Sequence, residues 1–415
     1  MKVGQAQLPE GWEIKKLGEV CDLIGGGTPS KKNLKFYEGD IFWATVRDMK
    51  SEIISDTEFK ITEEAVKKSS TNIIPKGNVI IATRVGLGKV CLIEKDTAIN
   101  QDLRGIVPKK SKQLDNGFLF QWIKSISHLI VEEGTGATVQ GVKLPFIKDL
   151  PIPIPPLPEQ QRIVSILDEA FAAIAKAKAN AEQNLKNAKE LFESYLQGVF
   201  EKLFEERETK RISDVAKVIG GYSFKSGDFK KEGKYQVIRM GNVRPGIIRE
   251  NESPVFIDEL EEKALSKALL IPKDVIITQT GTKNKRDYGF TVIIERENYL
   301  LNQRIAAIRF KKEYLPKFFL YFSWTNIFKD QYFANETGTV GQGNVGIGAI
   351  TDSQVPNIPF KEQQTIVHQL DALRDETQKL EAIYQKKLDD LEELKKSILQ
   401  KAFAGELKTE RGVEV

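Results

Sequence analysis

The sequence predicts an α+β protein in which two similar globular domains, each mixing helices and strands, are joined by a long antiparallel two-helix coiled coil. Three observations predict this class. The chain repeats itself at a constant offset, two long segments lack proline and glycine, and short β-branched runs precede each of those segments. A duplicated chain that folds around itself is expected to have an internal pseudo-two-fold axis, by analogy with dimers whose subunits share one interface.

The duplication is clearest where a proline-rich connector meets a predicted helix. The segment IPIPPLPEQQRIVSILD at 152–168 matches VPNIPFKEQQTIVHQLD at 355–371 without a gap. Upstream the match is looser, with KLGEVCDLIGG at 16–26 pairing with RISDVAKVIGG at 211–221, and Asn100-Gln101 pairing with Asn302-Gln303. A close match beside a loose one indicates a constant scaffold that carries two domains with different fine chemistry.

The repeat defines the predicted domain boundaries. We expect an N-terminal globular domain at 1–158, a first long helix at 159–204, a C-terminal globular domain at 205–361, a second long helix at 362–407 and a tail at 408–415. The net charge is +4, and the basic excess falls in the two globular blocks rather than in the helices. A modest basic surplus is compatible with a polyanionic partner without identifying one.

Both long segments are predicted to be helices that pack against each other. Extended connectors rich in proline precede them, and alanine, glutamate, lysine and leucine dominate their composition. Apolar side chains recur at two positions of a seven-residue repeat, which is the pattern of a coiled-coil seam. Two independent coiled coils with separate partners remain the alternative. The residues predicted to pair the helices are Ile163, Leu167, Ile174, Leu191, Tyr195, Ile366, Leu370, Leu373, Leu380, Tyr384, Leu391, Leu394 and Ile398.

A second apolar stripe on the first helix needs a further neighbour. Its members are spaced by multiples of seven residues, and one helix pair cannot cover them together with the seam. Either a globular domain or a partner protein packs there, and a partner is the preferred interpretation. The predicted docking residues are Val164, Phe171, Leu185, Phe192 and Val199.

The globular blocks contain both kinds of secondary structure. Short β-branched runs at 79–83, 89–93, 275–278 and 291–294 are typical of strands. The aromatic segments at 117–130 and 313–328 are predicted to be buried helices, whose tryptophan and tyrosine side chains belong to the core.

The composition excludes several classes of protein. Two cysteines and two histidines cannot build a disulfide framework or a Cys/His zinc site, so we expect a reducing, cytoplasmic environment and no metal. No long apolar run predicts a membrane span. The stretch GGGTPSKK at 25–32 lacks the spacing of a phosphate-binding loop, and no other catalytic motif is present. The sequence therefore predicts a protein without catalytic residues of its own.

The loops of both globular blocks carry side chains suited to DNA. Lysine and arginine neutralise phosphates, whereas arginine, asparagine and glutamine make paired hydrogen bonds to base edges. Such clusters recur at matched positions of the two blocks. The predicted DNA-binding residues are Thr28, Ser30, Lys31, Lys32, Lys35, Arg47, Arg84 and Arg104 in the first block, and Tyr222, Lys225, Arg239, Asn242, Arg244, Lys283, Lys285, Arg286 and Arg304 in the second.

These motifs together resemble one known family. GG-TPS near the start, the glycine-rich segments GTGATVQG and GTVGQGNVG, and the duplicated proline, Glu-Gln-Gln and helix junction look like the specificity subunit of type I restriction-modification systems. The resemblance covers nearly the whole chain. The second block departs from it, with GGYSFKSGD where the first has GGGTPSKKN.

The resemblance implies a non-catalytic subunit that reads DNA. Each globular block would be a target-recognition domain that reads one half of an asymmetric bipartite site on double-stranded DNA, and the helices would set the spacer and dock partners. The implied partners are two methyltransferase subunits and ATP-dependent restriction and translocation subunits. These would use S-adenosylmethionine, ATP and magnesium for adenine-N6 methylation and cleavage. The alternatives are a specificity protein of a type II-like modification system and a coiled-coil interaction scaffold without DNA specificity.

Overall fold

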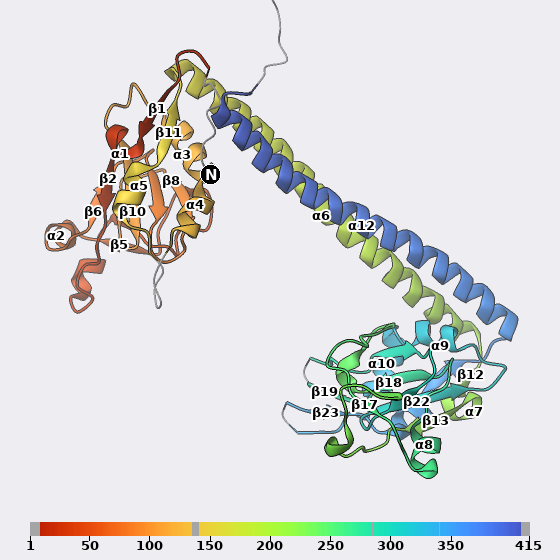
Figure 1. Cartoon of the computed structure of the whole chain (residues 1–415). Helices are drawn as coiled ribbons and strands as arrows, with labels where there is room; N and C mark the ends of the chain where they lie inside the picture. Colours follow the sequence, from red (N-terminus) through yellow and green to blue (C-terminus); the bar gives the residue numbers. More distant parts are fainter. Residues whose placement is uncertain (1–8, 135–140, 284, 340, 408–415) are drawn as a thin grey trace, which may run out of the picture. The chain divides into compact units, whose positions relative to one another are not determined.

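The computed structural model describes residues 9–134, 141–283, 285–339 and 341–407. The predicted tail at 408–415 and most of the GTGATVQG segment lie outside the described residues. Contacts divide the chain into two compact units, 1–181 with 386–415 and 182–385 (Figure 1). Each unit contains one globular domain and a part of both long helices. We call residues 13–154 the first head and residues 209–356 the second head.

The first head is built from two main sheets and a small clasp. Its five-stranded sheet has the order β2-β10-β7-β8-β4 and its four-stranded sheet the order β5-β3-β9-β6, while β1 pairs with β11. The strands are β1 (Glu13–Lys16), β2 (Cys21–Gly25), β3 (Ile41–Ala44), β4 (Ile53–Ile54), β5 (Phe59–Ile61), β6 (Asn72–Ile74), β7 (Val79–Ala82), β8 (Val90–Ile93), β9 (Thr97–Ile99), β10 (Leu103–Pro108) and β11 (Pro151–Ile154).

The second head repeats this plan, but its strands are divided among more and smaller sheets. The order β13-β22-β18-β20 corresponds to β2-β10-β7-β8, and β12 pairs with β24 as β1 does with β11. Its strands are β12 (Thr209–Arg211), β13 (Ala216–Gly220), β14 (Tyr235–Ile238), β15 (Val243–Arg244), β16 (Ile247–Ile248), β17 (Phe256–Ile257), β18 (Val275–Thr278), β19 (Thr280–Gly281), β20 (Thr291–Ile293), β21 (Tyr299–Leu301), β22 (Ile305–Phe310), β23 (Gly343–Asn344) and β24 (Gln354–Pro356). The four strands that the sequence predicts are all present as β7, β8, β18 and β20.

Each of the two aromatic helices predicted in the heads is divided in the structure. The segment 117–130 forms α3 (Asn116–Ser125) and α4 (Ser127–Glu132), and 313–328 forms α9 (Pro316–Phe322) and the start of α10 (Asn326–Phe333). Asp115 caps α3, accepting a hydrogen bond from Phe118 N, and Thr325 caps α10 in the same way. Serine and threonine compete for backbone partners inside helices, which explains the break before α10.

Short helices complete the heads. In the first head these are α1 (Leu17–Val20), η1 (Leu34–Tyr37), α2 (Glu63–Lys67) and α5 (Leu144–Asp149). In the second they are α7 (Ile212–Val215), η2 (Ser226–Asp228), η3 (Met240–Asn242), α8 (Glu262–Ala268) and α11 (Ile347–Asp352). Both cysteines are buried in the first head, and burial raises the pKa of the Cys21 thiol to about 12 and that of Cys91 to about 11.

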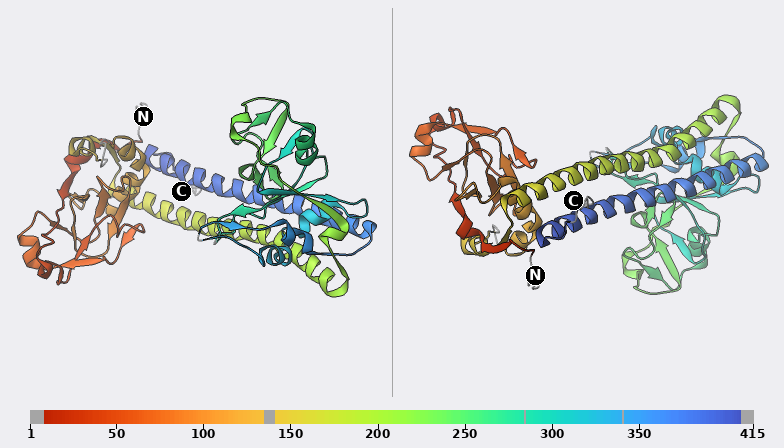
Figure 2. Two further views of the ribbon diagram at one scale, coloured as in Figure 1. Left: turned by 90° about the horizontal axis from the view of Figure 1, so that it is seen from below. Right: turned by 90° about the horizontal axis from the view of Figure 1, so that it is seen from above.

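The two long helices are α6 (Leu157–Glu206) and α12 (Phe360–Ala404). In the first unit, Ile163 and Leu167 of α6 share a core with Leu399 and Ala402 of α12. In the second unit, Leu196 and Phe200 of α6 share a core with the beginning of α12. The start of one helix thus meets the end of the other in each unit, so the paired segments are antiparallel (Figure 2). Among the described residues, no helix is long and apolar enough to cross a membrane.

The seam between the helices is narrower than the sequence pattern indicates. Small side chains fill its middle, where Ala181, Ala188 and Thr377 are almost fully buried. Of the predicted pairing residues, Ile163, Leu167, Ile174 and Leu370 are buried, and Ile366, Leu373, Tyr384, Leu391 and Ile398 are half-buried.

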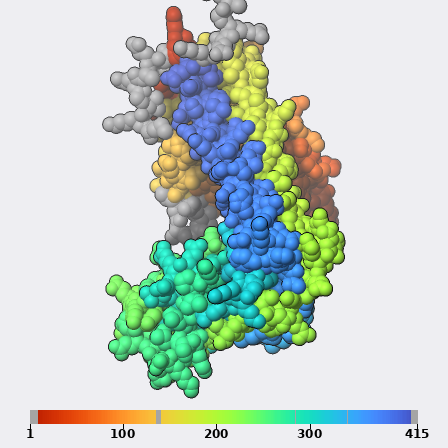
Figure 3. All heavy atoms as spheres, turned by 90° about the vertical axis from the view of Figure 1, so that its right-hand side faces the viewer, coloured from red at the N-terminus to blue at the C-terminus, as the bar shows by residue number. Residues whose placement is uncertain are grey.

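The remaining predicted pairing residues lie outside this narrow seam. Leu191, Tyr195, Leu380 and Leu394 keep between 37% and 50% of their surface exposed. With small residues in the seam, one position of each repeat carries most of the burial, and the second position lies at the edge of the interface. Figure 3 shows α12 in blue with one face open to solvent.

The second apolar stripe of α6 packs largely on the heads. Val164 and Phe171 contact the core of the first head, and Phe192 and Val199 contact that of the second. The Phe192 ring lies 6.0 Å from the ring of Tyr321 in an edge-on arrangement. The sequence leaves two possible neighbours for this stripe, a globular domain or a partner protein, and the structure places a head at these four positions. The fifth residue, Leu185, is half-buried. Docking of a partner protein on this stripe stays a prediction.

A buried glutamine amide joins the first head to its helix. Gln160, fully buried, accepts a hydrogen bond from Asp115 N at 2.8 Å. Its Nε2 donates to Gln113 O at 2.9 Å and to Pro155 O at 2.8 Å. One side chain therefore ties the beginning of α6 to the connector and to the loop that caps α3.

The second head uses the same junction. Gln363, 1% exposed, accepts a hydrogen bond from Leu315 N at 2.7 Å and donates to Glu313 O and Ile358 O at 3.1 and 3.0 Å. We call Gln160 and Gln363 the junction glutamines. Their recurrence explains why the Glu-Gln-Gln motif is the most similar part of the two halves.

Replacing a junction glutamine with leucine is expected to destabilise its unit by about 3 kcal/mol, because one buried N–H and two buried carbonyl groups lose their partners. Gln160→Leu and Gln363→Leu test this by denaturant unfolding. The neighbouring Gln161 and Gln364 are exposed, so Gln161→Leu and Gln364→Leu are matched controls expected to change the free energy of unfolding by less than about 0.5 kcal/mol. Equal effects at buried and exposed positions would contradict the assignment.

Candidate nucleic-acid interface

Two loops and the end of strand β3 meet the short turn at 100–102 of the first head, between β9 and β10. Gly27 N donates to Ile99 O at 3.0 Å, which ties the glycine-rich loop after β2 to the strand that enters the turn. Thr83 N donates to Asp102 O at 2.8 Å, which ties the loop after β7 to the end of the turn. Asn100 N donates to Ala44 O at 3.0 Å, which ties the turn to the last residue of β3.

The second head builds the turn at 302–304 on the same backbone hydrogen bonds. Tyr222 N donates to Leu301 O at 3.0 Å, and Gln279 N donates to Arg304 O at 2.8 Å. The end of β14 is also attached, because Asn302 N donates to Ile238 O at 3.3 Å. We call residues 100–102 and 302–304 the Asn-Gln turns. They bring together the loops that the sequence predicts to carry the DNA-binding side chains.

Close packing against the backbone of the Asn-Gln turns explains the glycines that follow β2 and β13. A Cβ atom on Gly26 would lie 2.2 Å from the carbonyl oxygens of both Ile99 and Asn100, and one on Gly221 would lie 1.9 Å from the carbonyl oxygen of Asn302. No heavy atom fits at such distances. The Gly-Gly pair that ends each repeated strand is therefore needed to let the Asn-Gln turn approach the sheet.

The predicted cations of the first head are mostly exposed, and Arg84 lies beside the Asn-Gln turn. Arg84 Nε lies 3.7 Å from Asp102 Oδ1, and Arg47 Nη1 lies 3.8 Å from Glu58 Oε1. Arg104 is half-buried on β10 with its guanidinium over Gly25. Thr28 is half-buried and donates to Gln101 Oε1. The exposed members of the loop that follows β2 and of η1 are Ser30, Lys31, Lys32 and Lys35.

Two polar side chains at matched positions shape loops in this structure. Asn242, a predicted DNA contact, is 2% exposed, accepts a hydrogen bond from Arg239 N at 3.0 Å and donates to the carbonyl oxygens of Arg249 and Glu252. Asp48 takes the same place in the first head, where its carboxylate accepts from Thr45 N at 2.7 Å. The DNA contact of Asn242 stays a prediction.

A hollow of about 510 Å³ lies beside the second Asn-Gln turn. Arg239, Asn242, Gln303 and Arg304 are among its lining residues. Arg239 Nε is buried and without a partner in the described part of the chain, although Nη2 of the same side chain donates to Ser253 O. The hollow thus unites three predicted DNA-binding residues with a glutamine that the prediction omitted.

The other predicted residues of the second head are spread over neighbouring loops. Arg244 is half-buried and donates to Gly241 O and Val243 O at 3.1 and 2.8 Å. Tyr222 is half-buried, Lys225 and Lys285 are exposed, and Lys283 is half-buried.

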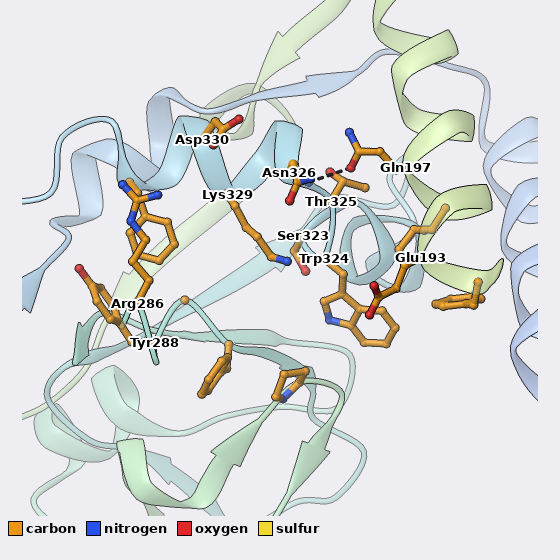
Figure 4. A pocket seen from close by; sticks show the side chains of 16 residues that line it. Glu193, Gln197, Arg286, Tyr288, Ser323, Trp324, Thr325, Asn326, Lys329 and Asp330 are labelled. Atoms are coloured by element: carbon orange, nitrogen blue, oxygen red, sulfur yellow. Dashed lines mark hydrogen bonds between the residues drawn. The ribbon is translucent and has the colours of Figure 1, made fainter. Parts of the chain in front are cut away.

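Arg286 belongs to a different hollow of the second unit, of about 590 Å³. Its guanidinium lies 4.8 Å from the centre of the Phe333 ring. In Figure 4, Arg286 and Trp324 stand at two walls of this hollow and Lys329 reaches into it. The neighbouring Asp287 accepts a hydrogen bond from Thr282 N at 2.6 Å, which lowers the pKa of that carboxyl group. The two hollows have no lining residue in common.

The candidate interface also contains the glutamines of the turns, which are not among the predicted DNA-binding residues. Gln101 and Gln303 are exposed. Gln101 accepts a hydrogen bond from the hydroxyl group of Thr28 in the loop after β2, and Gln303 accepts one from the hydroxyl group of Ser223 in the loop after β13. The recurrence of the Asn-Gln pair in both halves is the signal that could have found them. The sequence prediction uses this pair as a landmark of the repeat and does not include either glutamine among the predicted DNA-binding residues.

Comparison with known proteins identifies the family. The model for the type I restriction modification DNA specificity domain matches residues 9–186 and again 205–398. The chain belongs to this family. It is therefore a DNA sequence-recognition subunit without catalytic activity of its own, which functions with modification and restriction subunits. The family prediction made from the repeated motifs is confirmed.

Individual relatives agree with this assignment. The type I restriction enzyme MjaIX specificity subunit of Methanocaldococcus jannaschii is 28% identical over 67% of this chain and 68% of the relative. The EcoKI specificity subunit of Escherichia coli strain K12 is 25% identical over 97% of this chain and 90% of its own length.

Solved structures confirm the fold of two mixed domains with long helices. A chain from a study of complex assembly and conformational transition of the type I R-M system superposes with a TM-score of 0.76 at 19% identity, covering 97% of this chain and all of the other. The HsdS subunit of Thermoanaerobacter tengcongensis gives a TM-score of 0.64 at 19% identity, covering 98% of this specificity subunit and all of the other chain.

Adding one methyl group behind either turn is expected to lower stability. Gly26→Ala and Gly221→Ala place a Cβ atom inside the contact distance of a carbonyl oxygen, and such overpacking costs roughly 1–3 kcal/mol. Urea unfolding measures the loss. A Cβ atom on Gly348 in α11 would have no heavy atom within 4 Å, so Gly348→Ala serves as the control. Unchanged stability in both test variants would mean that the turn does not need the close approach.

Proposed function

We propose that each head of this specificity subunit reads one half of an asymmetric, bipartite site on double-stranded DNA. The observation that carries the proposal is the pair of Asn-Gln turns, which stand on the same backbone hydrogen bonds but carry different neighbouring side chains. Two domains with the same backbone arrangement but different side chains are suited to recognise two different DNA sequences. Exposed lysine and arginine residues around each turn supply phosphate contacts, which position a reader without specifying bases.

The remaining parts of the proposal concern the assembly. Helices α6 and α12 set the length of an unread spacer between the half-sites, much as dimer geometry sets half-site spacing in other DNA-binding proteins. Two methyltransferase subunits and the restriction subunits dock on the chain and supply catalysis with S-adenosylmethionine, ATP and magnesium. The complex acts on DNA in the cytoplasm. The predicted boundaries at 158, 204, 361 and 407 separate the reading and spacing functions.

Base-resolution mapping of N6-methyladenine in the host genome, with and without the gene, tests this proposal. Deletion is expected to remove one split motif whose two halves differ. Retention of every split motif, in cells shown to contain active methyltransferase partners, would contradict the DNA-reading role. A lost motif that is palindromic would contradict unequal reading by the two heads.

Lengthening both helices by one heptad is expected to lengthen the spacer. Seven residues add about 10 Å of helix, which corresponds to about three base pairs at roughly 3.4 Å each, and the seven-residue repeat keeps the seam in register. The insertions belong after Ala181 in α6 and after Gln385 in α12. Binding-site selection from random duplexes measures the spacer. A seven-residue insertion in α6 alone is the control, expected to break the pairing. An unchanged spacer in the double insertion would overturn the spacing role.

A further inference from the structure

The Asn-Gln turns present one side chain in the same way in both heads. Gln101 and Gln303 follow the anchored asparagines, and both are exposed. Thr28 Oγ1 donates to the amide of Gln101, and Ser223 Oγ donates to that of Gln303 at 3.1 Å. A hydroxyl group thus holds the oxygen end of each amide, and in the first head the NH2 end of Gln101 also donates a long hydrogen bond of 3.4 Å to Asp102 Oδ2. Restricting a long side chain before binding reduces the entropy lost on binding.

A guanidinium group accompanies each glutamine, but it comes from a different loop in each head. In the second head, Arg304 directly follows Gln303 in the turn. In the first head the equivalent residue is Asp102, whose carboxylate lies 3.7 Å from Nε of Arg84 on the loop after β7. The backbone hydrogen bonds of the two turns align Arg84 with Thr280 and not with a cation. Both heads therefore have an arginine beside the turn. It belongs to the loop after β7 in the first head and to the turn itself in the second.

The backbone of Arg304 gives independent support. Its φ angle of 69° lies in the left-handed region that favours glycine, and the hydrogen bond from Gln279 N holds its carbonyl group in place. Side chains kept in such conformations concentrate at functional sites. The same turn opens onto the hollow of about 510 Å³ that Arg239 also lines.

We propose that Gln101 and Gln303 are base-reading residues, each paired with one arginine. Each amide takes the N6 and N7 edge of an adenine in the major groove, and the accompanying arginine, Arg84 or Arg304, takes the O6 and N7 edge of a nearby guanine. These are the base edges that match a side-chain amide and a guanidinium group. Because the arginine approaches from a different loop, the adenine and guanine positions are arranged differently in the two half-sites. The proposal rests on the proposed function of the heads.

Selection from duplex pools, with the complete complex of specificity and methyltransferase subunits, tests the assignment. Gln303→Ala is expected to reduce the preference for adenine at one position of one half-site by about tenfold to a hundredfold and to leave the other half-site unchanged. Gln101→Ala is expected to do the reverse, so each variant is the control for the other. Gln113 is exposed beyond the far end of β10, and Gln113→Ala is expected to change neither half-site.

The outcomes separate this inference from the function on which it rests. If the wild-type complex selects no split site, bipartite reading itself fails. If it selects one and both glutamine variants keep the same preferences, only the base-reading role fails. Weaker binding to all sequences alike would make the glutamines backbone contacts and would also overturn the inference.

A second variant distinguishes reading from a structural role of the turn. Arg304→Gly relieves the left-handed backbone, so the melting temperature is expected to stay the same or rise while the guanine preference of one half-site is lost. A structural role predicts the opposite pattern, in which the variant melts lower and binds every sequence more weakly. Unchanged guanine preference would overturn the role of Arg304.

Discussion

The buried amides of the junction glutamines hold the architecture together. A side-chain amide in a dry environment must satisfy its donors and acceptor or cost stability, and Gln160 and Gln363 do so with three main-chain groups each. Those groups belong to the connector and to the loop before a head helix. Each amide therefore fixes the contact between a head and the start of one long helix, alongside the apolar contacts that the helices make with the core of that head.

The heads illustrate how one frame supports two different surfaces. Both turns rest on the same backbone hydrogen bonds, and both need a glycine where a carbonyl group approaches. Main-chain bonds place no demand on the identity of the side chains, so the half-buried Asp102 and the exposed Arg304 occupy equivalent positions with opposite charge. The backbone atoms of the turn thus support the fold, while its side chains differ between the two heads.

Much of the architecture is accessible from the sequence because it depends on local patterns. The two long helices, their antiparallel pairing, the strands β7, β8, β18 and β20, and the family all follow from repeats and periodicity. What the sequence does not reveal depends on tertiary contacts. The break before α10 reflects a capping threonine, and the exposure of Leu191 and Leu380 reflects a seam narrowed by alanine. The stripe that includes Phe192 is predicted to dock a partner because only the folded head reveals Tyr321 beside that ring. The glutamines of the turns escape prediction because their supporting hydroxyl groups are distant in sequence.

The junction also bears on how such a protein changes over generations. Gln160 and Gln363 form hydrogen bonds with peptide N–H and C=O groups of their heads, and almost any sequence supplies such groups. A head with quite different surface residues would still form the same hydrogen bonds, provided that its backbone kept the loop before α3 or α9. Exchange of whole heads by recombination, with crossovers near the proline-rich connectors, would then create new combinations of specificities in a single step while the helices stay unaltered.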